Sequence, residues 1–335
     1  MSTHAQAGSG SGSGTGDAPE PRIAPTHRES RGTGPDDSPD DSPDGGSRGL
    51  RGSLRRHPLT WFFALAFGLS WVAWTPYVLG GNGLGVLGFT FPGGLAGGQL
   101  LGMLPGAYLG PILSALLVTA ATEGRPGLRA WAGRLTKWRV GWRWYVGVIV
   151  AVPAVLTVTA TVVGGDSPVV PGAVALAGFV PGLIMQMVTT GLAEEPGWRD
   201  FAMPIIQRRS GALLGSLVVG LLWGLWHLPL FLTEWAEYPD VAWWEPVEFV
   251  ATTIAFSLVM TWVFNRTGQS LPVTMLLHVG VNNFNSVLWS DMFPELGREH
   301  AAHTFLVSSV VVAAVLLIAT RGRLGYEPAP DTVPS

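Results

Sequence analysis

Apolar stretches of membrane-spanning length recur along this chain from Leu59 onward. A helix that crosses a bilayer needs about 20 mostly apolar residues. Only 13% of the residues are charged, against roughly 25% in an ordinary soluble domain. We therefore predict an all-α fold, a polytopic transmembrane helical bundle of about eight spans. The spans are expected at residues 59–79, 100–121, 145–163, 173–193, 212–232, 247–264, 272–290 and 302–320.

The basic residues lie in alternate loops between these spans, and this pattern predicts the orientation of the chain. Cytoplasmic loops carry an excess of Lys and Arg. One set of loops contains Arg48, Arg51, Arg55, Arg56, Arg125, Arg129, Arg134, Lys137, Arg139, Arg143, Arg208, Arg209, Arg266, Arg321 and Arg323, whereas the opposite set is mainly acidic. We predict an integral membrane protein with both termini cytoplasmic. Because 19 of the 20 basic residues are Arg, as is typical of GC-rich genomes, the composition favours a bacterial plasma membrane.

Composition divides the chain into a tail, a membrane domain and a second, shorter tail. Residues 1–56 contain a Gly-Ser run and the repeat PDDSPDDSPDGG, and such a segment cannot bury enough apolar surface to fold. We predict a disordered cytoplasmic tail at 1–56, a transmembrane helical domain at 57–322 and a short C-terminal tail at 323–335. The sequence has no cysteine, which excludes disulfides and thiolate chemistry. A formal net charge of -3 gives no indication of a nucleic-acid partner.

Two adjacent carboxylates, Glu194 and Glu195, interrupt the apolar pattern, and ionisable groups at membrane depth usually mark function. Pro196 follows them and predicts a break or kink in the helix, or alternatively the first turn of a new helix. Glu195 and Arg199 are spaced to meet as an ion pair on one helix face. The alternative is that this segment, with Asp200, is a solvated loop after the fourth span.

Two further polar groups lie on later apolar segments. His227 follows a stripe of small residues, Ser216, Gly220 and Gly224, that lets another helix approach closely. His278 and Asn282 are one turn apart on a single helix face, so both side chains can address one point. Each group alone is also compatible with a structural role: a hydrogen-bonded core histidine in the first case, and interhelical hydrogen bonding in the second.

The ordered set of these motifs resembles the CAAX protease and bacteriocin-processing (CPBP, or Abi) family of intramembrane proteases, which includes the Rce1-type prenyl-protein proteases. The resemblance rests on Glu-Glu-x-x-x-Arg at 194–199, Trp-x-x-x-His at 223–227 and His-x-x-x-Asn at 278–282, and it covers about residues 173–290. Two departures are Trp223, where the family often has Phe, and Pro196 directly after the carboxylates.

The resemblance implies hydrolysis of a peptide bond, with Glu194 as general base and His227 holding the water. It implies that His278 and Asn282 donate hydrogen bonds to the developing oxyanion, a contribution of about 3–4 kcal/mol per donor in other enzymes. Glu195 and Arg199 would orient the site. Glu194, His227 and His278 with a water would also suit a catalytic Zn²⁺, and a metal-free glutamate mechanism uses the same residues.

Rival functions stay open at this point. A non-catalytic immunity or scaffold protein of the same fold would tolerate loss of one polar position, and all are present here. A secondary transporter is expected to have a pair of broken helices, and only one such break is predicted. The expected partners are the lipid bilayer and a membrane-associated protein or peptide substrate, of the CAAX or the bacteriocin type.

Overall fold

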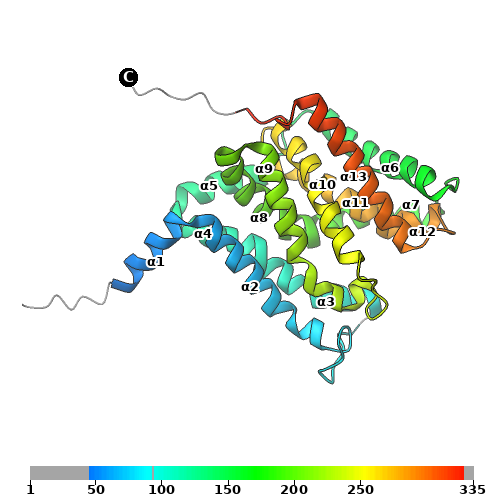
Figure 1. Cartoon of the computed structure of the whole chain (residues 1–335), viewed down its shortest axis with the longest axis horizontal. Helices are drawn as coiled ribbons and strands as arrows, with labels where there is room; N and C mark the ends of the chain where they lie inside the picture. Colours follow the sequence, from blue (N-terminus) through cyan, green and yellow to red (C-terminus); the bar gives the residue numbers. More distant parts are fainter. Residues whose placement is uncertain (1–44, 93, 328–335) are drawn as a thin grey trace, which may run out of the picture. The chain divides into compact units, whose positions relative to one another are not determined.

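The structure is a computed structural model that describes residues 45–92 and 94–327. All the regular elements in this part of the chain are helices (Figure 1). The predicted tails lie mostly outside these residues. The α-helices are α1 Gly45–Arg56, α2 Pro58–Leu79, α3 Gly94–Ala107, α4 Leu113–Thr122, α5 Gly124–Leu135, α6 Trp142–Gly164, α7 Ala173–Gln186, α8 Leu192–Gly197, α9 Met203–Trp226, α10 Glu245–Arg266, α11 Leu271–Asn283, α12 Trp289–Met292 and α13 Arg298–Thr320. Short π-helical segments, η1 Tyr108–Ile112, η2 Met187–Gly191, η3 Trp198–Ala202 and η6 Phe284–Leu288, join several of them, and the 3-10 helices η4 Leu228–Leu232 and η5 Glu234–Ala236 follow α9.

Every predicted span falls on helix, which confirms the all-α fold. Six helical stretches of the described residues are long and apolar enough to cross a membrane. One of them, Ala173–Leu232, has 60 residues. At about 1.5 Å per residue it is long enough for two crossings, and a non-helical Gly211 with a φ of 80° bends it. The helical stretch from α11 to α12 is not among the six, so the structure supports the predicted count only approximately.

The boundaries of the predicted tails differ from the structure. Helix α1 occupies the last part of the segment predicted to be disordered. Its half-buried Leu54 packs against the hydrophobic core, and Ser53 accepts a hydrogen bond of 3.1 Å from the indole of Trp61 on α2. At the other end, Leu324 is fully buried and its carbonyl accepts from Asn265. Both segments are poor in apolar residues, so the few contacts that order them leave little signal in composition.

The stripe of small residues on α9 packs against α10, as predicted. A Cβ atom added to Gly220 would lie 2.7 Å from Cα of Ile254, and one added to Gly224 would lie 2.4 Å from the hydroxyl of Thr253. Ser216 donates a hydrogen bond of 2.8 Å to Thr261 across the same seam. These close approaches fix α10 beside the end of α9 that carries His227.

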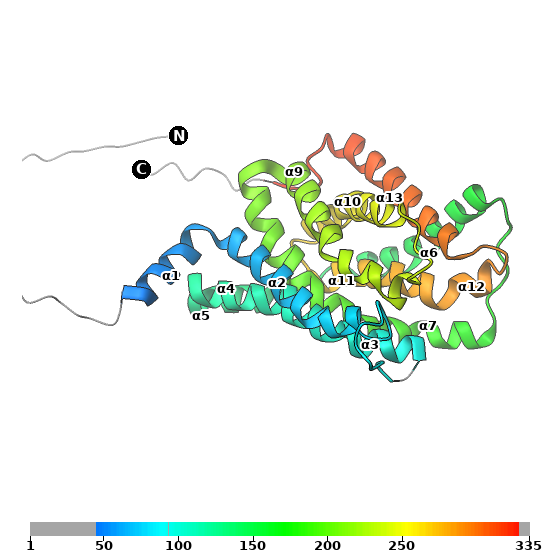
Figure 2. The same cartoon turned by 60° about the horizontal axis from the view of Figure 1, so that its bottom comes forward.

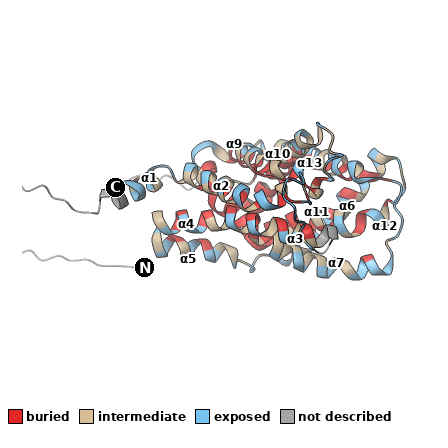
Figure 3. Ribbon diagram, turned by 90° about the horizontal axis from the view of Figure 1, so that it is seen from below, coloured by how far each residue is buried: buried red, intermediate tan, exposed pale blue. Residues whose placement is uncertain are grey.

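Most helices of the bundle have a buried face and an exposed face. Figure 3 shows buried residues on the inward faces of the helices and exposed residues along their outer faces. Many outward side chains are large and apolar, such as Val162, Val174 and Ile318, which are 77%, 88% and 80% exposed. An apolar outer surface of this extent is expected of a protein whose solvent is lipid. Helix α2 lies beside α3 and α4, and α10 lies between α9 and α13 (Figures 1 and 2).

Candidate functional site

The adjacent carboxylates lie on the short helix α8, with π-helical segments η2 before it and η3 after it. Pro196 lies inside α8 and does not end it, so the predicted break is replaced by widened helical turns. The alternative in which Pro196 begins a new helix is wrong for the same reason. A π-helical turn accommodates an extra residue without ending the helix and is frequent at functional sites.

The charged residues of this segment are buried. Glu194 is 6% exposed, Glu195 and Arg199 are fully buried, and Asp200 is 2% exposed. The alternative that they form a solvated loop is therefore wrong. Buried charges are costly unless they are paired, so each of these groups needs a partner in the bundle.

Glu195 contacts two other predicted site residues. Its Oε2 lies 3.3 Å from Nε of Arg199, which places the two charges at ion-pair distance without the alignment of a hydrogen bond. Its Oε1 accepts a hydrogen bond of 2.8 Å from Nδ1 of His278 on α11. Glu195 therefore joins α8 to α11.

Arg199 has further partners on α10 and α9. Its guanidinium donates to the hydroxyl of Ser257 at 2.7 Å and lies 3.3 Å from the sulfur of Met260. Its Cζ lies 5.3 Å from the ring centroid of Trp223, within the range of a cation–π contact. The Arg199 guanidinium thus has partners on α8, α9 and α10.

Glu194 faces α9. Its Oε2 accepts a hydrogen bond of 2.7 Å from the indole N–H of Trp223 and lies 4.0 Å from Nε2 of His227. The Nδ1 of His227 lies 2.9 Å from the Trp223 carbonyl, an acceptor, so this nitrogen carries the proton. In the neutral ring, Nε2 is therefore an acceptor directed at Glu194.

Asn282 completes the set on α11. Its side-chain nitrogen lies 3.5 Å from Nε2 of His278, a long contact that places the amide and the imidazole side by side, as their spacing predicts. Asn282 is half-buried, whereas His278 is 4% exposed. The ring of Trp223 connects the two halves of the site, because its centroid lies 5.0 Å from that of His278 and 6.0 Å from that of His227.

The structure thus brings all six predicted site residues together in one polar cluster inside an apolar bundle. The donor role of Trp223 and the contacts of Ser257 and Met260 with Arg199 were not predicted from the sequence. Trp223 lies one turn before His227, and this spacing was a usable signal for their contact. Ser257 carried only a weak signal, as one hydroxyl in an apolar span.

The part of the chain that contains this cluster is similar to known proteins. Residues 176–284 match the family model of the type II CAAX prenyl endopeptidases, Rce1-like. This part of the chain is similar to the Rce1-like endopeptidases. It contains all six predicted site residues and confirms the resemblance.

A curated relative supports the same assignment. The chain is 27% identical over 107 residues to the CAAX prenyl protease 2 of Methanococcus maripaludis, which covers 31% of this chain and 39% of that protein. The chain therefore aligns with about two fifths of the relative's length. The six long apolar helices and the match to an Rce1-like membrane family together indicate an integral membrane protein.

A catalytic zinc site needs three protein ligands that converge on one point. In residues 45–92 and 94–327, no group of three or more His, Asp or Glu side chains is placed to hold a metal ion. Glu194 and His227 approach each other, and His278 donates its Nδ1 to Glu195, which leaves its Nε2 available as a ligand. Zn²⁺ binding by Glu194, His227 and His278 stays a prediction, because these side chains do not converge on one point as they are placed.

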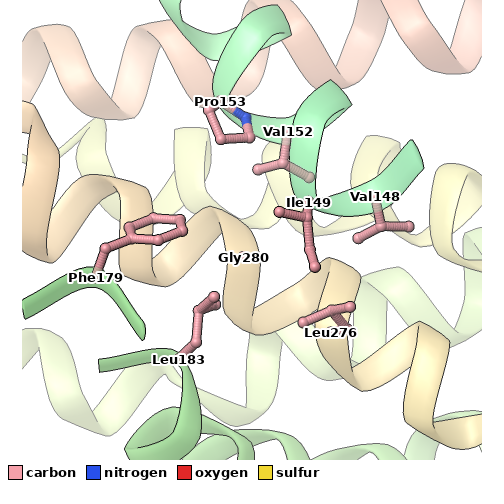
Figure 4. A pocket seen from close by; sticks show the side chains of 8 residues that line it. All are labelled: Val148, Ile149, Val152, Pro153, Phe179, Leu183, Leu276 and Gly280. Atoms are coloured by element: carbon pink, nitrogen blue, oxygen red, sulfur yellow. The ribbon is translucent and has the colours of Figure 1, made fainter. Parts of the chain in front are cut away.

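A separate cavity lies between α6, α7 and α11 (Figure 4). Its lining is apolar, with Phe179 and Leu183 of α7 facing Val152 of α6. Its volume of about 10 Å³ is close to the minimum for one water, which would find no polar partner there. This cavity contributes nothing to the polar cluster.

Proposed function

We propose that this chain is an intramembrane endopeptidase that hydrolyses a peptide bond of a membrane-associated protein or peptide. The observation that carries the proposal is the pair formed by Glu194 and His227. Two acceptor atoms, the carboxylate Oε2 and the imidazole Nε2, face each other at 4.0 Å. This separation suits one water that donates a proton to each.

In the proposed reaction, Glu194 takes a proton from this water as the water oxygen attacks the carbonyl carbon of the substrate. General-base catalysis by a positioned side chain contributes about 10²- to 10⁴-fold. His227 holds the second proton of the water through Nε2, because its Nδ1 is committed to the Trp223 carbonyl. Glu194 then gives its proton to the leaving amine, so that the carboxylate is regenerated.

The developing oxyanion needs donors, and we assign them to His278 and Asn282. The amide of Asn282 is a donor in any protonation state. His278 directs its Nδ1 to Glu195, so it donates through Nε2 only when the ring carries both protons. The buried carboxylate of Glu195 balances that charge, and Arg199 holds Glu195 in place.

We propose a substrate carried in the bilayer, of the CAAX type or of the bacteriocin type. The matched relative is a CAAX prenyl protease by name, which makes a lipid-modified C-terminal peptide the first substrate to test. We place the site in a bacterial plasma membrane with both termini cytoplasmic, on the basis of the Arg-rich loops.

Cleavage of quenched fluorescent peptides by the detergent-purified full-length protein tests this function. The peptides end in a CAAX-type sequence, with and without a farnesyl group. Glu194→Gln and His227→Ala are expected to lower kcat by at least about 100-fold, the lower end of the general-base contribution. Glu248→Gln is the matched control, because the side-chain partner of Glu248 is His303 on α13 and not a residue of the polar cluster.

Cleavage that persists in both site variants would refute the proposed roles. A wild-type protein inactive on all peptides would favour a non-catalytic protein of the same fold. A zinc chelator added to the active wild-type protein decides the metal question. Retained activity supports the metal-free mechanism, and loss of activity that added Zn²⁺ restores would overturn it.

A further inference from the structure

Helix α5 and the residues just after it contact the helices that carry the candidate site. It belongs to none of the six candidate spans, and it also lies outside the segment that matches the Rce1-like family. One face, with Gly127 and Trp131, is buried, while Arg125 and Arg129 are exposed. The helix therefore packs against the bundle along one side only.

The buried face of α5 contacts the helix that carries the carboxylates. The indole N–H of Trp131 donates a hydrogen bond of 3.2 Å to the carbonyl of Pro196, the residue after Glu195. Three residues farther along α5, Arg134 forms an ion pair with Asp200, whose side chain is fully buried on η3. Both contacts fall where the helix is distorted by Pro196 and by the π-helical turns.

The residue range just after α5 contacts the start of α11. The hydroxyl of Ser270, the N-terminal flanking residue of α11, donates to the carbonyl of Lys137 at 2.7 Å. The ammonium of Lys137 donates in turn to the carbonyl of Gly268 at 2.5 Å. Helix α11 carries His278 and Asn282, so one short segment is bonded to both site helices.

We propose that Trp131, Arg134 and Lys137 form a clasp that sets the position of the carboxylate helix relative to the histidine helix. These are positioning residues, and their effect on catalysis rests on the proposed protease function. Within the site, α8 and α11 are joined directly by the hydrogen bond of 2.8 Å between Glu195 and His278. The clasp is a second connection between the same two segments, at a distance from the reacting groups.

The physical reason is the geometry of the distorted helix. Wider turns and a proline leave backbone groups without their usual partners, and neighbouring side chains must satisfy them. Loss of Arg134 would leave the Asp200 carboxylate buried without a counter-charge, so η3 would shift to reach water. A displacement of about 1 Å in an active site can cost about 100-fold in rate.

Hydrogen exchange measured by mass spectrometry tests the clasp without reference to activity. In the full-length protein, Trp131→Phe, which removes only the N–H donor, is expected to increase exchange in residues 192–202. Arg134→Ala is expected to increase exchange there and in residues 270–283, and Arg134→Lys to restore protection. Arg129→Ala and Trp138→Phe are the matched controls, because both side chains are exposed on the same segment.

Peptide cleavage by the same variants tests the consequence. We expect Arg134→Ala to lower kcat by up to about 100-fold with KM unchanged, and Arg134→Lys to recover activity. Unchanged exchange in both segments would overturn the clasp whatever the activity. Increased exchange with an unchanged kcat would overturn the positioning role. A wild-type protein that cleaves no peptide would refute the proposed function alone, because exchange still decides whether the clasp exists.

Discussion

At Glu195 and Arg199, two opposite charges are fully buried within one helix and its neighbours. Removing one member of such a pair costs about 3–5 kcal/mol, because the other charge is left without compensation. Replacing both members by uncharged groups of similar size is often neutral or stabilising. We therefore expect the pair to matter more for the placement of His278, which Glu195 binds, than for the stability of the fold.

The cost of leaving one buried charge unpaired predicts the order of Tm among the wild-type protein, a single variant and a double variant. Glu195→Gln keeps an oxygen acceptor for His278 but leaves Arg199 without a counter-charge, and it is expected to lower the Tm. The double variant Glu195→Gln with Arg199→Met removes both charges, and its Tm is expected above that of the single variant. Thermal unfolding in detergent measures both. A double variant with a Tm equal to or below that of the single variant would contradict the argument.

At the scale of the element, the close approach of α9 to α10 depends on Gly220. Gly220→Ala would place a methyl group 2.7 Å from the Ile254 backbone, so α10 must move. Overpacking of this kind costs about 1–3 kcal/mol, and the shift would also move Ser257, which holds Arg199. We expect a lower Tm and a lower cleavage rate.

Gly147 provides the matched control for this substitution. It lies in α6, and a Cβ atom added there meets nothing within 4 Å. Gly147→Ala is expected to leave the Tm unchanged or raise it, since Ala favours a helix over Gly by about 1 kcal/mol. If the two alanine variants have the same Tm, the close approach at Gly220 is not what limits stability.

Local spacing explains which elements and contacts the sequence predicts. The spans follow from apolar length, and the pairing of Glu195 with Arg199 follows from an interval of one helical turn. The same rule finds the seam of small residues on α9. The contacts of Trp131 with Pro196 and of Arg199 with Ser257 join residues 65 and 58 positions apart. No periodicity relates such positions, so only the folded chain shows them. The break predicted at Pro196 did not occur, because Pro196 lies inside α8 between two π-helical segments that keep the helix continuous.

At the scale of the whole molecule, the basic and acidic loops predict which end of the bundle faces the cytoplasm. The absence of cysteine from the sequence makes this directly measurable, because a single introduced cysteine is then the only thiol. Ser210 lies on α9 beside Arg209, and Ser290 lies on α12 beside Asp291, and both are exposed. Serine and cysteine are similar in size, so either substitution is expected to leave the fold intact.

Labelling of intact cells with a membrane-impermeant maleimide then reports the orientation. We expect Ser290→Cys to be labelled in intact cells and Ser210→Cys only after the membrane is permeabilised, because positively charged loops are retained in the cytoplasm. The reverse pattern would place both termini outside and would overturn the proposed orientation. Equal labelling of both positions in intact cells would mean that the two loops share one face.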